Sequence, residues 1–181
     1  MMKSSHNLHA QLLLLQVGAA PSADGEGEQT SEQAGLAVLP AFLAKAGLGV
    51  GEARIEEGSG LSRHNLVTPR ALVGLLEYMR RHPHANVFLE SLPVAGVDGT
   101  LRTRLRGTPA EGNLRAKTGS LSQVSTLAGY VNTAAGEPLA FALLLNNYAG
   151  GPDDRPGRAE LDDLAVMLAS LRQHTRDAPA D

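Results

Sequence analysis

Residues 114–147 read LRAKTGSLSQVSTLAGYVNTAAGEPLAFALLLNN, and this stretch decides the fold class. Runs of apolar and β-branched residues predict three strands, at 114–121, 125–133 and 138–147. The four residues between the second and third strands include a glycine, as the turn of a hairpin often does. We therefore expect three consecutive antiparallel strands.

Five segments outside the strands show the apolar spacing of helices. The clearest begins at Thr68 and Pro69, because threonine is a good N-cap and proline suits the first helical position. Its buried stripe is expected to hold Ala71, Leu72, Leu75, Leu76 and Met79. The other helices are predicted at 5–17, 31–46, 85–92 and 159–171.

Some shorter features accompany these elements. In the helix at 31–46, Ser31 is the expected N-cap and Pro40 is expected to break or kink the helix. Residues 19–29 are rich in Gly, Ser and Glu and predict a linker or a surface loop. A short strand is expected at 54–57. Residues 101–106 fit either a strand or a helical turn.

Composition excludes several classes of function. The net charge is -3 with both signs interspersed, and only 3% of residues are aromatic, which argues against a nucleic-acid partner. No apolar run approaches the roughly 20 residues of a membrane span. The first residues lack the pattern of a signal peptide. The chain has no cysteine and its histidines lack metal-ligand spacing, so we expect no disulfide or metal site.

The tetrapeptide Lys117-Thr118-Gly119-Ser120 combines a cation, two hydroxyls and a residue without a side chain. Such a group suits a strand that binds an anionic substrate while its backbone amides stabilise an oxyanion. The alternative is an exposed strand edge without a function. A second element, Ser5-x-Asn7, lies just ahead of a predicted helix, where both residues could equally form an N-cap cluster. Together the two elements match part of a known acyl-transfer signature.

The chain resembles the C-terminal part of the D-alanyl-D-alanine carboxypeptidase/endopeptidases, the class C low-molecular-mass penicillin-binding proteins. The resemblance implies the α+β fold of serine β-lactamases and penicillin-binding transpeptidases, an antiparallel sheet with packed helices, here with the N-terminal part missing. It also implies a peptidase portion over 1–175 and a disordered tail at 176–181. The matching segments, in order, are Lys3-x-Ser5-x-Asn7, 58–65, 92–101, 116–121 and 127–130.

The family's catalytic roles map onto three residues of this chain. The resemblance implies that the Ser5 hydroxyl relays a proton toward the leaving amine, and that Asn7 hydrogen-bonds the acyl-side amide of the substrate. Lys117 would polarise Ser5 and add positive charge for the terminal carboxylate. No metal or organic cofactor is implied.

Three further residues would bind the substrate, a peptidoglycan stem peptide ending in D-Ala-D-Ala. Thr118 would hydrogen-bond its terminal carboxylate, Gly119 would keep the strand edge clear, and the backbone N–H of Ser120 would be one oxyanion donor. β-Lactams would bind the complete enzyme at the same place. Complete family members are expected to work in the periplasm or elsewhere outside the cytoplasm.

One departure from the family pattern is severe. No Ser-x-x-Lys occurs in the sequence, whereas the family carries its nucleophile and base on a helix upstream of Ser-x-Asn. We therefore expect a fragment, a truncated product or half of a split protein, inactive alone and prone to self-association through an open sheet edge. The alternative is a non-catalytic module that binds peptidoglycan or a partner.

Other polar residues receive structural interpretations. Ser59 and Ser62 are expected to serve turns and caps, because the nucleophile-elbow pattern Gly-x-Ser-x-Gly is not met there. Asp98, just before Gly99, is typical of a turn. For the arginines at 102, 104 and 106, a solvated strand face is favoured over an anion-binding patch.

Overall fold

The computed structural model describes residues 1–20, 29–49, 51–148 and 156–174. The chain divides into two compact units, one made of Met1 and residues 6–78, the other of residues 2–5 and everything from Met79 onward. Each is described by itself below. The expected tail at 176–181 and most of the expected linker at 19–29 lie outside the described residues.

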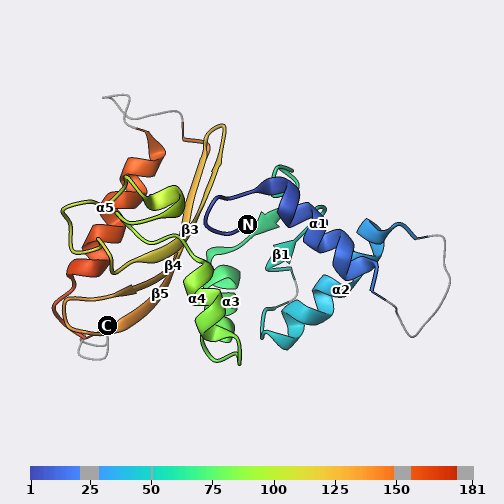
Figure 1. Ribbon diagram of the computed structural model, residues 1–181, viewed down its shortest axis with the longest axis horizontal. Helices are drawn as coiled ribbons and strands as arrows, with labels where there is room; N and C mark the ends of the chain where they lie inside the picture. Colours follow the sequence, from blue (N-terminus) through green and yellow to red (C-terminus); the bar gives the residue numbers. More distant parts are fainter. Residues whose placement is uncertain (21–28, 50, 149–155, 175–181) are drawn as a thin grey trace. The chain divides into compact units, whose positions relative to one another are not determined.

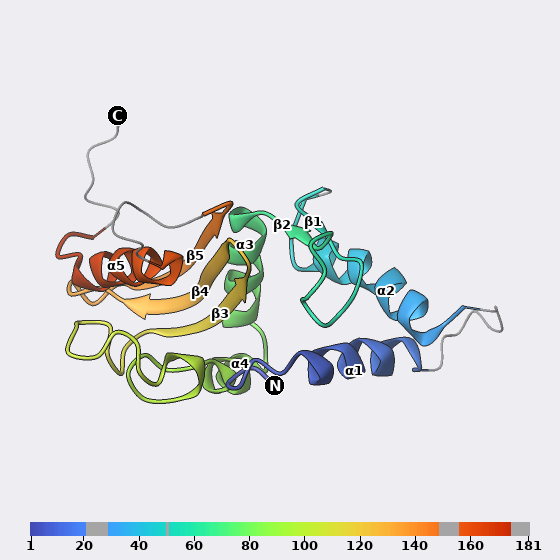
Figure 2. The ribbon, with the colours of Figure 1, turned by 90° about the horizontal axis from the view of Figure 1, so that it is seen from above.

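A three-stranded antiparallel sheet forms the centre of the second unit (Figure 2). Its strands β3 (Arg115–Leu121), β4 (Val124–Asn132) and β5 (Pro138–Asn146) confirm the three predicted strands to within about a residue at most ends. The turn between β4 and β5 closes through a bond from the backbone N–H of Glu137 to the Thr133 hydroxyl, at 3.0 Å. The local pattern therefore sufficed to predict this sheet.

Helix α5 (Gly157–Ser170) lies along one face of the sheet (Figure 1). Side chains alternate between the faces of a strand, so one face of β4 meets the helix and the other does not. The apolar contact between them forms the core of this unit. Its fully or almost fully buried residues include Ala116, Leu127, Val131, Phe141, Leu161, Ala165 and Ala169.

The segment that contains the three arginines is not a strand. It follows a short 3-10 helix, η1 (Gly99–Leu101), and runs on as turns, so the interpretation as a solvated strand face is wrong. Arg104 instead makes a two-pronged ion pair with Asp162 of α5, with N···O distances of 2.7 and 3.1 Å. Its side chain is only 17% exposed. Arg104 therefore links the 101–106 segment to α5.

Replacing Arg104 by alanine is expected to lower the free energy of unfolding by about 1–3 kcal/mol, because a charge-assisted pair in a partly buried place is lost. Thermal or urea unfolding followed by circular dichroism measures this. Arg102→Ala is the matched control, since Arg102 is exposed. Equal destabilisation by both substitutions would contradict a specific tie to Asp162.

In the first unit, helices α1 (Asn7–Gly18) and α2 (Ser31–Lys45) pack against each other. Two glycines allow a close approach, because a Cβ on Gly18 would overlap the backbone of α2, and one on Gly35 would lie 2.5 Å from the carbonyl oxygen of Leu14. The first turns of α2 are therefore held by packing on α1, and propensity alone does not determine the helix.

Two details of α2 differ from expectation. The N-cap is Thr30, which forms a capping box with Gln33, so the assignment of Ser31 as the cap is wrong by one residue. Pro40 lies inside the helix without ending it. Proline removes one backbone hydrogen bond, but its φ is helical, so a capped helix with a packing partner can continue through it.

The rest of the first unit consists of a small strand pair and a helix. Strand β1 (Ala53–Arg54) pairs with β2 (Leu66–Val67), so only the first residue of the strand expected at 54–57 belongs to one. Helix α3 (Pro69–Arg80) begins as predicted, with the Thr68 hydroxyl accepting from the N–H of Ala71. The final two residues of α3 and helix α4 (Ala85–Ser91) belong to the second unit. Among the helices described, none has the length and apolar character needed to cross a membrane.

Candidate active site

Ser5 and Lys117 meet within the second unit, although 112 positions separate them in the chain. The Lys117 ammonium donates to the Ser5 hydroxyl at 2.6 Å and also bonds the carbonyl oxygen of Thr118. Ser5 has a φ of +54°, a left-handed conformation that costs a serine roughly 1 kcal/mol. Strained non-glycine residues of this kind cluster at functional sites.

The environment of Lys117 alters its acidity. The side chain is partly buried on β3, and this burial lowers the pKa of Lys117 below that of an ordinary lysine. A lysine with a lowered pKa releases a proton more readily at neutral pH. Beside a hydroxyl it can therefore both polarise the O–H group and resupply a proton.

The short segment that carries Ser5 is fixed by contacts of Lys3 with the turn at 97–100. The Lys3 ammonium pairs with the Asp98 carboxylate, and the Lys3 carbonyl oxygen accepts from the N–H of Thr100 at 3.1 Å. Gly99 is needed between them, because its φ is +55° and a Cβ there would lie 2.5 Å from the Lys3 carbonyl oxygen. These contacts fix the backbone just ahead of Ser5.

Asp98 lies in a turn as expected, and it also has a role that the sequence did not indicate. Its carboxylate accepts from Lys3 and, at 2.8 Å, from the N–H of Val94. Desolvation raises the pKa of Asp98, but these hydrogen bonds outweigh it and hold the pKa below its usual value. The aspartate therefore stays charged as the anchor of Lys3.

The rest of the Lys-Thr-Gly-Ser motif lies on β3. The Thr118 hydroxyl donates to the Thr100 hydroxyl at 2.8 Å, a partner that sequence reasoning missed. The Cβ that Gly119 lacks would overlap the hydroxyl of Thr126 on β4, so the space beside Gly119 is already occupied. Ser120 is exposed and pairs with Ser125.

Asn7 belongs to the first unit, as the first residue of α1. Its side-chain amide donates to the carbonyl oxygen of Ser59 at 2.7 Å. The N-cap position of α1 is His6, so the interpretation of Ser5 and Asn7 as capping residues is wrong. Ser59 and Ser62 serve turns as expected, their hydroxyls accepting from backbone N–H groups two residues on.

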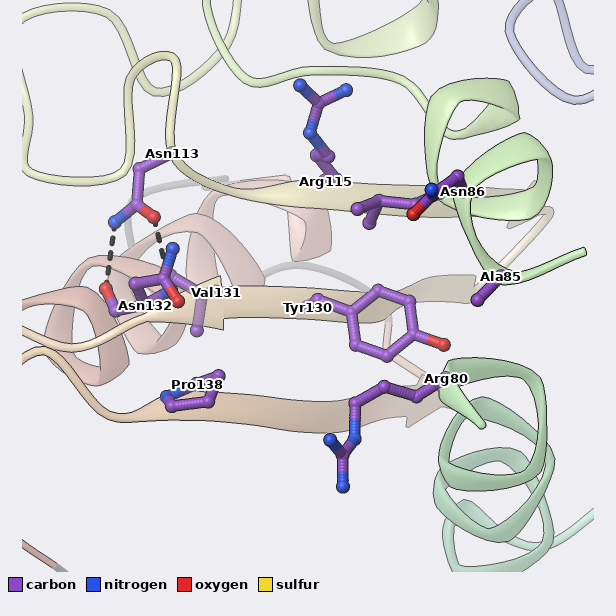
Figure 3. Close-up of a pocket in the computed structure, with 10 residues that line it drawn as sticks. Arg80, Ala85, Asn86, Asn113, Arg115, Tyr130, Val131, Asn132 and Pro138 are labelled. Atoms are coloured by element: carbon purple, nitrogen blue, oxygen red, sulfur yellow. Dashed lines mark hydrogen bonds between the residues drawn. The ribbon is translucent and has the colours of Figure 1, made fainter. Parts of the chain in front are cut away.

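A pocket of about 250 Å³ opens on the second unit and was not foreseen from the sequence (Figure 3). Residues from all three strands line it together with Arg80 and α4. Arg80 and Arg115 point away from each other in this view, so their guanidinium groups do not converge on one anion (Figure 3). The Asn113 side chain braces one wall by bonding the backbone N–H and carbonyl oxygen of Asn132. Within the described ranges, no three or more His, Asp or Glu side chains are placed to hold a metal ion.

Comparison with known proteins gives consistent matches. Residues 1–168 match the D-Ala-D-Ala carboxypeptidase 3 (S13) family. The chain is 40% identical over 178 residues to the D-alanyl-D-alanine carboxypeptidase of Actinomadura sp. strain R39, covering 96% of this chain and 31% of that protein. It is 42% identical over 123 residues to the D-alanyl-D-alanine carboxypeptidase DacB of Haemophilus influenzae, covering 67% and 26%.

Solved structures agree with these matches. A crystal structure of penicillin binding protein 4 (dacB) from H. influenzae, in complex with a β-lactam, superposes with a TM-score of 0.78 at 37% identity, over 93% of this chain and 39% of that one. A predatory endopeptidase of Bdellovibrio bacteriovorus gives a TM-score of 0.71 at 21% identity, over 94% and 44%, and supports the fold alone. The expected α+β penicillin-binding fold is confirmed. The chain spans about a third of the length of the relatives it matches.

Proposed function

This chain belongs to the D-Ala-D-Ala carboxypeptidase 3 (S13) family, and we propose that it supplies half of the active site of a serine-type peptidoglycan D-Ala-D-Ala carboxypeptidase/endopeptidase. The observation that carries the proposal is the 2.6 Å bond between the Lys117 ammonium and the Ser5 hydroxyl. Two family motifs that lie far apart in the sequence meet in that bond. A chance Lys-Thr-Gly tripeptide would have no reason to face the serine of a Ser-x-Asn element.

Ser5 and Lys117 act on the leaving group. When the peptide C–N bond breaks, the Ser5 hydroxyl gives its proton to the departing D-alanine nitrogen, and the adjacent Lys117 ammonium replaces that proton. The lowered pKa of Lys117 favours this second transfer. The acylated serine and its base come from a Ser-x-x-Lys region, which the sequence of this chain does not contain.

Lys117, Thr118 and Ser120 bind the substrate. A D-Ala-D-Ala peptide ends in a carboxylate, and an ammonium beside a hydroxyl is a suitable receptor for it. Thr118 exchanges its present partner, Thr100, for that carboxylate by rotating its hydroxyl hydrogen. The N–H of Ser120 serves as an oxyanion donor, and the missing side chain of Gly119 leaves room for the Thr126 hydroxyl beside it.

A second candidate function is a non-catalytic module that binds peptidoglycan or a protein partner. In the described part of the chain, β5 pairs with β4 alone, so its other edge is open to another strand. That edge supports self-association of the 181-residue chain or completion of the sheet by further polypeptide. The complete protein would work outside the cytoplasm.

Fluorescent penicillin separates the two functions. The purified 181-residue chain is expected to show no covalent label, because it has no nucleophile to acylate. A hybrid is then made in which the upstream part of the H. influenzae relative, where the family pattern places Ser-x-x-Lys, precedes this chain. We expect the hybrid to be labelled stoichiometrically, and prior incubation with unlabelled benzylpenicillin to block the label.

Two outcomes would contradict this scheme. Stoichiometric labelling of the isolated chain would show that it holds a nucleophile of its own. A folded hybrid that remains unlabelled would favour the non-catalytic module. Folding of the hybrid is checked independently by circular dichroism and by a cooperative thermal transition.

A further inference from the structure

The loop at 56–65 contains a sequence motif, Gly58-Ser59-Gly60-Leu61-Ser62, to which the proposed function assigns no role. The loop is organised around the Glu57 carboxylate. This carboxylate accepts from the backbone N–H groups of Ser59, Gly60 and Ser62 and from the side-chain amide of Asn65, at distances between 2.6 and 3.1 Å. Four donors on one carboxylate make a fixed loop from a glycine-rich segment.

One of these bonds orients a single peptide group toward Asn7. The N–H of Gly60 and the carbonyl of Ser59 belong to the same planar peptide unit. Glu57 holds the N–H end of that unit at 2.9 Å, and Asn7 donates to its carbonyl end at 2.7 Å. The carboxylate, the peptide and the asparagine amide therefore form a continuous chain of hydrogen bonds, in which each bond polarises the next.

The loop is also docked on the helix that carries Asn7. Gln11, one turn beyond Asn7 on α1, accepts from the N–H of Gly58 at 2.8 Å and donates to Glu32 of α2 at 2.6 Å. A Cβ at position 58 would lie 2.8 Å from the Cβ of Leu14. The glycine motif therefore lets the loop approach α1 closely enough for the Ser59 carbonyl to reach Asn7.

The bond to Ser59 settles which way the Asn7 amide faces. A carbonyl oxygen only accepts, so the Nδ2 atom of Asn7 must point at it, and its Oδ1 atom points elsewhere. The second N–H of Nδ2 and the Oδ1 atom are available to hydrogen-bond another amide. Without the Ser59 contact the side chain could flip and present the opposite pattern.

We propose that Glu57 is a positioning residue for Asn7, acting through the Ser59–Gly60 peptide group to fix the amide that receives the acyl side of the substrate. The inference rests on the proposed role of Asn7 and adds a residue to it. Hydrogen bonds from the loop lower the pKa of Glu57 although desolvation raises it, which agrees with a carboxylate that stays charged in this role. The glycines at 58 and 60 thereby gain a physical reason.

The experiment uses the 181-residue chain and follows the side-chain amide protons of Asn7 by NMR. In Glu57→Gln, an NH₂ group replaces one carboxylate oxygen and faces the N–H of Ser59 or those of Gly60 and Ser62, so the loop loses hydrogen bonds and the charge that strengthens the others. Exchange of the Asn7 protons with water is expected to accelerate about tenfold, as for the loss of one hydrogen bond. The matched control is Glu56→Gln, because the neighbouring Glu56 carboxylate pairs with Arg54 and His64 instead.

If Glu57→Gln does not fold, Glu57→Asp replaces it, since the shorter side chain keeps the charge but withdraws the carboxylate. A smaller acceleration of Asn7 exchange is then expected. Unchanged exchange at Asn7, combined with loss of protection at residues 59–62, would overturn the proposal, because Glu57 would then build the loop without positioning Asn7. Equal effects of the substitutions at positions 56 and 57 would also overturn it.

A second readout tests what the positioned amide does. In the hybrid enzyme, Glu57→Gln and Asn7→Ala should slow acylation by benzylpenicillin, which has an acyl-side amide, about tenfold more than acylation by 6-aminopenicillanic acid, which has none. If Glu57 and Asn7 only supported the fold, their substitution would slow acylation by both ligands equally. Equal slowing of acylation by both ligands, together with accelerated exchange at Asn7, would overturn the proposed role of Asn7 in the reaction. A hybrid that is not labelled would instead contradict the proposed function.

Discussion

Replacing Lys117 by methionine is expected to slow penicillin acylation of the hybrid about 10²- to 10³-fold, the usual cost of removing a preorganised charged donor from an acyl-transfer site. Methionine keeps the length of the side chain and removes its charge. The Ser5 hydroxyl then loses the ammonium that lies 2.6 Å away and the carboxylate of the ligand loses its cation. The rate of labelling by fluorescent penicillin, measured at several concentrations, gives the change.

Lys45→Met is the control for this experiment, because Lys45 is the exposed last residue of α2. It should acylate at the unchanged rate. Ser5→Ala should slow acylation strongly as well, and the double variant should be little slower than either single one, since the two groups act as a unit. Fully additive effects, or a Lys117→Met variant as fast as the parent, would show that the bond between them has no part in catalysis.

The sheet could be predicted from the sequence because its information is local. Each strand of 114–147 carries its own apolar run, and the strands follow one another through short connections. Register then follows from the turns, as the pairing of Gly119 with Thr126 and of Gly129 with Phe141 illustrates. The helix from Pro69 was predicted for the same reason, since its cap and its stripe are both local.

Contacts between distant segments were not predictable in this way. Nothing in the pattern of residues 101–106 indicates that Arg104 pairs with Asp162, 58 positions later. The same holds for Lys3 and Asp98, whose pairing anchors the segment ahead of Ser5. Local chemistry can propose a solvated arginine, but only the packing of the chain decides which carboxylate it meets.

The candidate site was found partly by resemblance and partly missed. The family pattern, rather than spacing, put Ser5 and Lys117 together, and the structure brings them within a hydrogen bond. The sequence analysis assigned no role to Thr100, which lies inside the matching segment 92–101, or to Glu57, which directly precedes the segment 58–65. A threonine after Asp98-Gly99 is a residue whose hydroxyl often bonds nearby groups in a turn, so a signal for Thr100 was present. No comparable local pattern marked Glu57.

The second large effect is expected at Gly129, in the middle of β4. Its missing Cβ would overlap the carbonyl oxygen of Arg115 and lie 2.6 Å from the Cα of Ala116, both backbone atoms of the neighbouring strand. Backbone cannot move aside as a side chain does, so Gly129→Ala must push β3 away from β4. We expect a loss of about 3 kcal/mol or more, at the upper end of overpacking substitutions.

This substitution joins stability to function, because β3 carries Lys117. Pushing β3 outward at Ala116 displaces the next residue, so the bond from Lys117 to Ser5 should lengthen even at temperatures at which the sheet remains folded.

Gly136→Ala is the control: its φ is +80° but nothing lies within 4 Å of the added methyl group, so only about 1 kcal/mol of backbone strain is expected. Thermal unfolding separates the two variants, and Gly129→Ala should also slow acylation of the hybrid at temperatures where it remains folded. A Gly129→Ala variant that melts with the parent and acylates normally would mean that the sheet has room for the methyl group, and that close packing of β3 on β4 does not hold Lys117 in place.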